Sequence, residues 1–343
     1  MPKSAKAASA AATKADQTAA EDPASVVAEG GTTKPAKRVS SAKRGAGTLS
    51  AATPAPPAKP APRPEDEPVE ALPVRGRLSV RKTYKLYIGG AFPRSESGRT
   101  YLVDGDNAAL ASRKDARDAV VAARKAQAKW AGATAYNRGQ VLYRIAEMIE
   151  ARRAEFEALG VDAAEVDAVI DRWVWYAGWS DKIAQVAGNA NPVAGPFFNL
   201  SAPEPTGVVA VAAPSSLLGL VSVIAPAVVT GNTVVVVTPQ AQIAITLAEA
   251  LATSDVPGGV VNILTGRAAE VAPWLASHDD VNALDLTGIA DPDLATELER
   301  SAAGTLKRVL RPPAGEPDFT GDPGLRPMTA LLETKTVWHP KGF

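Results

Sequence analysis

Few side chains in this chain could act as nucleophiles or metal ligands. None of its 343 residues is cysteine, which excludes a thiol nucleophile, a disulfide and any thiolate metal site. The two histidines are His278, at a predicted helix-to-strand turn, and His339, in the tail; we expect neither to act in chemistry, and we expect no metal site. Ser215 and Ser216, near the end of a predicted strand, are the remaining candidate nucleophiles, and neither has an evident base partner.

The two serines follow the first strand of a stretch, 204–266, that has the pattern of a parallel sheet. Its strand-like runs are short, β-branched and uncharged, as in strands buried on both faces, and helix-like segments connect them. The predicted order is a strand at 208–214, a helix at 215–230, a strand at 233–237, a helix at 243–253 and a strand at 260–264. This is a βαβαβ half of a doubly wound α/β fold, in which ligands bind at the carboxyl ends of the strands.

Further elements complete and cover this sheet. The second half is predicted as a helix at 267–277, a strand at 281–286, a helix at 291–303 and a strand at 305–310. Amphipathic helices are predicted at 114–131, with Ser112 as the N-cap, at 138–158 and at 171–189. The last of these carries Trp173, Trp175, Tyr176 and Trp179. We interpret this aromatic cluster as core packing rather than as a ligand site.

The composition gives no support to several classes of function. The 37 basic and 37 acidic side chains cancel, so net charge gives no reason to expect a partner such as nucleic acid or a membrane surface. No apolar run has the length and charge-free flanks of a membrane span, and the first residues lack the apolar core of a signal peptide. We therefore expect a cytoplasmic protein that binds no membrane.

Residues 1–76 differ in composition from the rest and are predicted to be a disordered tail. Ala, Lys, Pro, Ser and Thr dominate, and a segment with so few large apolar side chains cannot offset the entropy of ordering. The alternative is an arm for nucleic acid, formed by Lys34, Lys37, Arg38, Lys43 and Arg44. Acidic residues follow at 65–67 and no aromatic residue is interleaved, so we favour a solvated tail that binds no nucleic acid.

Several motifs of the central stretch resemble a known family. The segments EPTGVV, APAVVTGNTVVVV and PGGVVNILTG agree in order and spacing with the cofactor-binding core of the aldehyde dehydrogenase superfamily. The predicted helices at 114–131, 138–158 and 171–189 are similar to the same family. The resemblance implies a Rossmann-like, cofactor-binding-type domain over 77–314, with protruding oligomerisation strands at about 189–205.

The end of the chain, TALLETKTVWHPKGF, resembles the family's C-terminal strand, which reaches across the oligomer to a neighbouring subunit. Residues 315–343 are therefore expected to form a linker and an intersubunit strand. The 29 residues beyond Ala314 are too few for a second βαβ domain, so we expect the catalytic domain to be missing, and the chain resembles the cysteine-less second module of two-module aldehyde dehydrogenases. Without its catalytic domain, the strand LLETKTVW would be an exposed edge unless it paired with another chain.

The chemistry that the resemblance implies needs a cysteine thiolate, an asparagine that holds the oxyanion and a general-base glutamate. The thiol is absent. The asparagine position falls in Pro214-Ser215-Ser216, where the Ser216 hydroxyl would be a shorter donor. The general-base position is occupied by Pro312, which cannot take a proton. We therefore expect no catalytic residue, with Ser216 and Pro312 as degenerate positions.

The positions that hold NAD(P) in the family are only partly kept. Thr238 and Ala241 stand where the family has a lysine and a glutamate that hold the adenosine ribose, and Gly288 keeps only the glycine of the pyrophosphate motif. The residual cofactor-binding positions are Pro214, Ser215, Thr238, Ala241, Gly266, Thr287 and Gly288. We expect no cofactor, with NAD(P) binding as the alternative.

Three functions remain as hypotheses. The favoured one is a catalytically inactive subunit, a pseudoenzyme, that associates with a full-length aldehyde dehydrogenase, or with itself, through 189–205 and 328–343. The second is an NAD(P)-dependent oxidoreductase acting on aldehydes, or an NAD(P)-binding sensor domain. The third, with least weight, is a nucleic-acid-associated protein that acts through its basic tail.

Overall fold

The computed structural model describes residues 80–315 and 317–342, so the predicted tail at 1–76 lies outside the described residues. The strands are β1 (Thr83–Tyr84), β2 (Thr100–Val103), β3 (Asp106–Ala109), β4 (Asn189–Asn191), β5 (Phe197–Pro205), β6 (Val208–Ala212), β7 (Thr233–Thr238), β8 (Val261–Thr265), β9 (Ala283–Asp285), β10 (Arg308–Leu310) and β11 (Leu332–Pro340). The helices are α1 (Arg113–Ala131), α2 (Ala135–Glu150), α3 (Arg153–Ala158), α4 (Ala163–Trp179), α5 (Ile183–Ala187), α6 (Leu217–Val229), α7 (Ala241–Ala252), α8 (Ala268–Ala276), α9 (Pro292–Ala303) and α10 (Arg326–Thr329).

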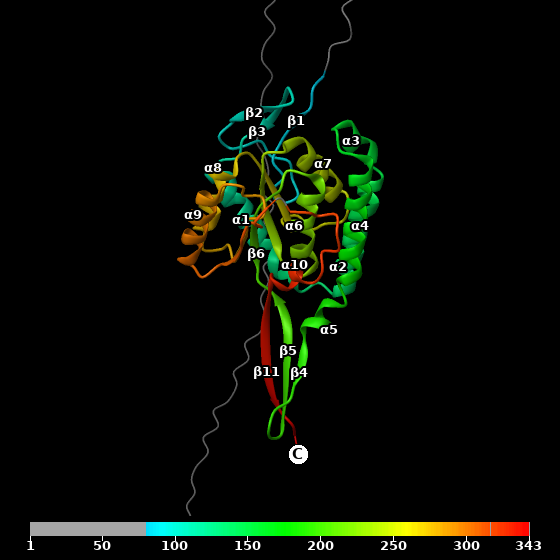
Figure 1. Ribbon diagram of the computed structural model, residues 1–343, viewed down its shortest axis with the longest axis vertical. Coiled ribbons are helices and arrows are strands. Elements are labelled where there is room, and N and C mark those ends of the chain that lie inside the picture. Colours follow the sequence, from blue (N-terminus) through cyan, green and yellow to red (C-terminus); the bar gives the residue numbers. More distant parts are fainter. Residues whose placement is uncertain (1–79, 316, 343) are drawn as a thin grey trace, which may run out of the picture. The chain divides into compact units, whose positions relative to one another are not determined.

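The central sheet has five strands in the order β10-β9-β6-β7-β8, and all its neighbouring strands are parallel. The chain runs outward from β6 through β7 to β8 and then returns to β9 on the other side of β6. The strand order therefore reverses between β6 and β9, which is the switch point of a doubly wound sheet. The predicted α/β fold with a doubly wound parallel sheet is confirmed (Figure 1).

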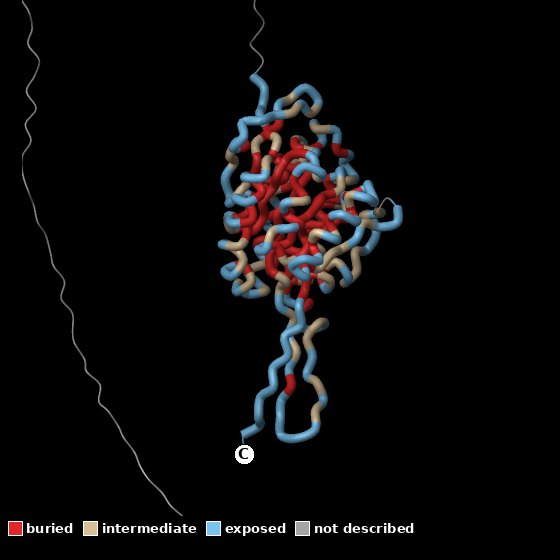
Figure 2. The backbone as a smooth tube through the Cα atoms, turned by 90° about the vertical axis from the view of Figure 1, so that its left-hand side faces the viewer, coloured by how far each residue is buried: buried red, intermediate tan, exposed pale blue. Residues whose placement is uncertain are grey.

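The valine-rich strands of this sheet supply a hydrophobic core on each face, because successive side chains of a strand point to opposite sides. Val209 and Val211 pack with buried residues of α2, α4, α6 and α7. Val208 and Ala210 pack with buried residues of α1, α8 and α9. Buried segments accordingly gather in the centre of the α/β body (Figure 2, red), where each fully buried valine contributes about 1.5–3 kcal/mol.

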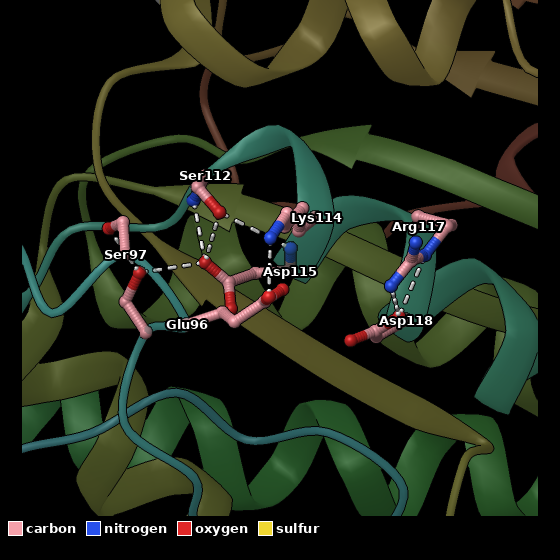
Figure 3. Close-up of polar contacts among 8 residues, drawn as sticks. Glu96, Ser97, Ser112, Lys114, Asp115, Arg117 and Asp118 are labelled. Atoms are coloured by element: carbon pink, nitrogen blue, oxygen red, sulfur yellow. Dashed lines mark hydrogen bonds and ion pairs between the residues drawn. The ribbon is translucent and has the colours of Figure 1, made fainter.

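Helix α1, which packs on β7 and β8, begins with a capping box. Ser112, the predicted N-cap, accepts a hydrogen bond from the backbone N–H of Asp115, and its own backbone N–H donates to the Asp115 carboxylate at 2.7 Å (Figure 3). Lys114 adds an ion pair with Glu96 at 2.6 Å, also visible in Figure 3. The box provides partners for amide groups that the first turn of a helix leaves free.

The helix predicted at 138–158 is divided in the structure. Helix α2 ends at Glu150, and α3 begins at Arg153 after the chain turns. The turn places Phe156 in the core, where its side chain is fully buried. The single amphipathic pattern in the sequence therefore spans two helices that both contribute to the same core.

Helix α4 begins earlier than predicted, at Ala163. Val166 and Val169 extend the buried row of Trp173 and Tyr176 toward the N-terminus at helical spacing, and all four side chains are fully buried. The interpretation of the aromatic residues of this helix as core packing agrees with the burial of its central tryptophan and tyrosine.

Strands β11, β5 and β4 form an antiparallel sheet, in that order, which projects from the α/β body and is called the projecting sheet below (Figure 1). Strand β11 pairs with β5 over nine positions, from Leu332 opposite Pro205 to Pro340 opposite Phe197. Most residues of these strands are exposed (Figure 2, pale blue). The strands predicted at 189–205 are thus confirmed as a protruding element.

The expectation that the C-terminal strand lacks a partner in its own chain is wrong. Strand β11 pairs with β5 of the same chain along its whole length. Met328 and Leu331, both buried, fix the chain at the base of β11 and direct the strand along β5. Within the described part of the projecting sheet, β11 and β4 are the edge strands, and the outer edge of each has no neighbouring strand.

Candidate functional site

A cavity of about 950 Å³ lies at the carboxyl ends of β6, β9 and β10. Pro214 and Ser215 follow β6, Thr287 and Gly288 follow β9, Pro312 follows β10, and all five line the cavity. The structure brings these sequence-predicted residues together because β6, β9 and β10 are neighbours in the sheet. The cavity therefore lies at the switch point, where doubly wound folds bind ligands.

The loops after β6 and β9 are packed directly against each other beside this cavity. The backbone N–H of Gly288 donates to the Ala212 carbonyl at 2.9 Å. A Cβ atom at position 288 would overlap the Ala213 carbonyl and lie 2.6 Å from the Pro214 nitrogen. Both are backbone groups that cannot rotate away, so only glycine fits at this position.

Gly288→Ala is expected to lower the free energy of unfolding by about 1–3 kcal/mol, because the backbone must move to admit the methyl group. Gly178→Ala is the matched control: Gly178 lies in α4, and a Cβ atom there meets no atom within 4 Å. Alanine stabilises a helix by about 0.5–1 kcal/mol relative to glycine. Chemical denaturation measures both variants, and equal stability of the two would contradict the close packing of these loops.

The candidate nucleophiles lie near the cavity without a base. Ser215 is exposed at its wall, whereas Ser216 is the N-cap of α6 and accepts a hydrogen bond from the Gly219 N–H at 3.0 Å. The ionisable side chains among the described lining residues are Glu299 and Arg311, which form an ion pair with each other at 2.8 Å. A serine without a base at hydrogen-bond distance remains a weak nucleophile. The lining that the structure describes thus offers no activated nucleophile.

The helices that follow β6 and β9, namely α6 and α9, already hold carboxylates of the chain at their N-termini. At α6 the backbone N–H of Leu218 donates to the Glu165 carboxylate at 2.9 Å. At α9 the Asp291 carboxylate accepts from the N–H groups of Asp293 and Leu294, at 2.9 and 3.4 Å. A helix N-terminus binds an anion through its free N–H groups and its dipole. Here the N–H groups of Leu218, Asp293 and Leu294 are in use and the carboxylates would repel a pyrophosphate, so these two helix N-termini do not fit a dinucleotide phosphate.

The remaining predicted cofactor-binding positions lie at the carboxyl ends of β7 and β8 and are all buried: Thr238, Ala241 and Gly266. Strands β2 and β3 and the residues that follow them cover this edge. The Tyr101 hydroxyl donates to the Pro239 carbonyl at 2.8 Å, and the Ala111 N–H donates to the Thr265 carbonyl at 2.8 Å. The structure therefore does not bring these three residues into the cavity with the other five.

Sequence reasoning missed Asp285, a carboxylic acid inside β9. Its side chain is 4% exposed, and its Oδ1 accepts hydrogen bonds from the backbone N–H of Thr287, at 2.9 Å, and from the Thr287 hydroxyl. Burial raises the pKa of the Asp285 carboxyl above its ordinary value, while the bonds from Thr287 act in the opposite direction. One acidic residue within the apolar run of a central strand was the signal that could have identified it.

Within residues 80–315 and 317–342, no group of three or more His, Asp or Glu side chains is placed to hold a metal ion. His278 is half-buried in the turn before β9, where its Nδ1 accepts from the backbone N–H of Asp280 at 3.1 Å. His339 lies exposed in β11. Across the same part of the chain, each helix is too short or too polar to cross a membrane.

Comparison with known proteins relates the chain to one family. The family model described as "Aldehyde dehydrogenase family" matches residues 105–314. The protein "Aldehyde dehydrogenase, cytosolic 1" of Elephantulus edwardii is 32% identical over 250 residues, which cover 66% of this chain and 49% of that protein. The "Cytosolic 10-formyltetrahydrofolate dehydrogenase" of Mus musculus is 34% identical over 239 residues, which cover 62% of this chain and 26% of that protein. The chain spans about half the length, or less, of these curated relatives.

Solved structures share the fold over the same share of the chain. An NAD⁺ complex of an aldehyde dehydrogenase from Bacillus cereus has a TM-score of 0.61 and 27% sequence identity, and the match covers 66% of this chain and 50% of that one. HpcC from Thermus thermophilus has a TM-score of 0.61 and 30% identity, with 66% of this chain and 47% of that one covered. The family model alone matches more than half of the residues. The chain belongs to the aldehyde dehydrogenase family.

Proposed function

We propose that this chain is a catalytically inactive subunit, a pseudoenzyme of the aldehyde dehydrogenase family, which acts in the cytoplasm by associating with a full-length aldehyde dehydrogenase. The chain has no cysteine that could form a covalent intermediate. Ser216 stands at the position of the oxyanion donor and serves as a helix cap, and Pro312 stands at the position of the general base. These substitutions support a subunit that does no aldehyde chemistry by itself.

The observation that carries the proposal is the surface of the projecting sheet. On one face Phe198, Leu200 and Val337 are 56%, 48% and 39% exposed, and Leu200 lies directly opposite Val337. On the other face Trp338 is 57% exposed and its ring lies 5.8 Å from that of Phe197. A three-stranded sheet with apolar side chains exposed on both faces gains stability when a partner covers it.

The favoured partner is a full-length member of the same family, which would supply the catalytic groups that this chain lacks. The outer edge of β11 has no neighbouring strand among the described residues, and such an edge can pair with a strand of another chain. A second copy of this chain is the alternative partner, because in a two-fold dimer the apolar surfaces of the two projecting sheets would pack against each other.

Co-purification of the tagged chain from its native source tests the association. We expect a full-length aldehyde dehydrogenase, identified by its peptides, in a fixed ratio to this chain. A chain that ends at Leu332 keeps the buried Met328 and Leu331 and is expected to lose the partner. If the shortened chain captures the partner equally well, β11 is not part of the interface. If the tagged full chain is recovered only as an oligomer of itself, the partner is a second copy of this chain.

A second candidate function is an NAD(P)-dependent oxidoreductase that acts on aldehydes, or an NAD(P)-binding sensor domain. The cavity at the switch point favours it, because Pro214, Thr287 and Gly288 come together there. We expect no binding heat and no thermal stabilisation with NAD⁺ or NADP⁺ at millimolar concentration, since Glu165 and Asp291 occupy the helix N-termini. Calorimetric titration measures the heat of binding, and saturable binding would instead favour the sensor. Thermal unfolding would then show the same binding, because ligand at 100 times its Kd adds about 2.7 kcal/mol of stability.

A further inference from the structure

A second cavity, of about 730 Å³, adjoins the first and is called the connection cavity below; the two share Thr287, Arg311, Pro312, Pro313 and Pro317. Its walls come from α6, the ends of β9 and β10, and the connection 317–331 that leads to β11. Arg172 of α4 holds this connection in place, because its Nη2 donates to the carbonyls of Phe319 and Gly321 at 2.5 and 2.9 Å. The cavity is therefore built partly from a segment fixed by a buried cation.

Two buried polar side chains line the connection cavity and have unused hydrogen-bonding capacity. Ser222 of α6 is 7% exposed, and its hydroxyl has no hydrogen-bond partner within the described part of the chain. Asp285 is 4% exposed, and both hydrogen bonds from Thr287 end at its Oδ1, which leaves Oδ2 for another donor or acceptor. A buried hydroxyl without a partner has lost its bonds to water without compensation, so a ligand that bonds to it would bind more tightly.

A cation lies at the exposed side of the connection cavity. Arg326 is exposed there and forms no ion pair with any residue that the structure describes. Arg308, which also lines the cavity, is held by Glu333 through two bonds of 2.7 Å, and Arg311 is held by Glu299. The apolar lining includes Val223, Leu310, Phe319 and Leu331. Among the described lining residues, Arg326 is thus the guanidinium that remains available to an anion.

We propose that the connection cavity binds a small organic carboxylate with an apolar or aromatic body and a hydroxyl group at its other end. The ligand carboxylate pairs with Arg326, whose planar fork suits two parallel hydrogen bonds. The ligand body lies on the apolar lining, and its hydroxyl bonds to Ser222 and Asp285.

The hydroxyl is favoured over a charged group because burial favours the neutral form of the Asp285 carboxyl, which can donate to or accept from a hydroxyl. A second carboxylate on the ligand would be repelled at this end, and an ammonium would need Asp285 to ionise in a buried place. The site does not use the projecting sheet, and its polar groups on Ser222, Asp285 and Arg326 lie outside the lining of the cavity at the switch point, so it goes beyond the proposed function.

Calorimetric titration of the full chain with 4-hydroxyphenylacetate tests this site. Saturable binding is expected. Phenylacetate lacks the hydroxyl and 4-methylphenol lacks the carboxylate, and each is expected to bind about tenfold more weakly, which corresponds to about 1.4 kcal/mol. Absence of binding by all three probes, or equal affinity for them, would overturn the proposal.

Two variants assign the ends of the ligand to residues. Ser222→Ala is expected to weaken 4-hydroxyphenylacetate about tenfold and to leave phenylacetate unchanged, because the hydroxyl and Ser222 act as a pair. Arg326→Gln is expected to weaken both carboxylates and to leave 4-methylphenol unchanged. Ser277→Ala, at an exposed serine outside the cavity, is the control and should change nothing. Thermal unfolding confirms that each variant is folded, and wild-type affinities in both cavity variants would refute the assignment.

Discussion

Replacing Leu200 and Trp338 together by aspartate is expected to weaken the association with a full-length aldehyde dehydrogenase by about 100-fold or more. These side chains are 48% and 57% exposed on opposite faces of the projecting sheet, so the substitutions remove little packing within the chain. Large apolar side chains at the centre of an interface commonly contribute about 2 kcal/mol or more each, and a buried aspartate adds a desolvation penalty. Surface plasmon resonance with the co-purified partner measures the change.

Leu102→Asp is the matched control for this double variant. Leu102 is 70% exposed and lies in β2, which belongs to a different sheet. Its affinity for the partner should equal that of the wild type. If the double variant binds as tightly as Leu102→Asp, the projecting sheet is not the interface.

Arg172→Leu is expected to lower the free energy of unfolding by about 1.5–3 kcal/mol, the range for hydrogen bonds to a charged group. Arg172 is 7% exposed, and the substitution removes the donor that serves the carbonyls of Phe319 and Gly321. Since these bonds hold the connection 317–331, limited proteolysis should also cut this segment faster. Denaturant unfolding and the rate of cleavage are the two measurements.

Arg144→Leu is the control that shows whether replacing any arginine by leucine would lower the stability equally. Arg144 pairs with Glu147 at 2.6 Å on the exposed side of α2, and exposed ion pairs contribute about 0–1 kcal/mol. A small change and an unaltered cleavage rate are therefore expected. Equal losses in the two variants would mean that Arg172 does not hold the connection.

Strands β6 and β7 of the central sheet could be predicted because their residues are uncharged and mostly β-branched. Residues 234–237 are valine at every position, which fits burial on both faces, and each of these strands is followed by a helix-length segment. Five of the predicted site residues lie at one cavity because the carboxyl ends of parallel strands share an edge of the sheet. The apolar runs and the strand order were sufficient to predict the sheet and the place where these five residues meet.

Other features depend on tertiary contacts that the local pattern does not contain. The carboxylate of Glu165 reaches the N-terminus of α6 from a helix whose start lay outside the predicted segment. Burial of Thr238 and Ala241 results from β2 and β3, which are distant in sequence. The pairing of β11 with β5 joins segments separated by more than a hundred residues, and a resemblance alone suggested a different partner for that strand.

The proposed loss of catalytic groups is compatible with retention of the fold, because the two concern different positions. Pro312 and Pro313 follow β10 after Arg311, and proline at this point lies beyond the three residues of β10 that pair with β9, so it removes no bond from the strand. Ser216 caps α6 and so stabilises the helix at the position where the family resemblance implies an oxyanion donor. Pro312 and Ser216 are therefore compatible with the strand and the helix at whose ends they lie.

Aldehyde-dependent reduction of NAD⁺ or NADP⁺ by the purified chain alone tests the proposed inactivity most directly. The chain should be refolded from denaturant and purified again, so that no co-purified enzyme contributes. We predict no rate above that of buffer with aliphatic or aromatic aldehydes, because the chain has no cysteine and the ionisable side chains among the described lining residues, Glu299 and Arg311, are paired with each other. A rate that rises in proportion to the concentration of this chain would contradict the assignment as an inactive subunit.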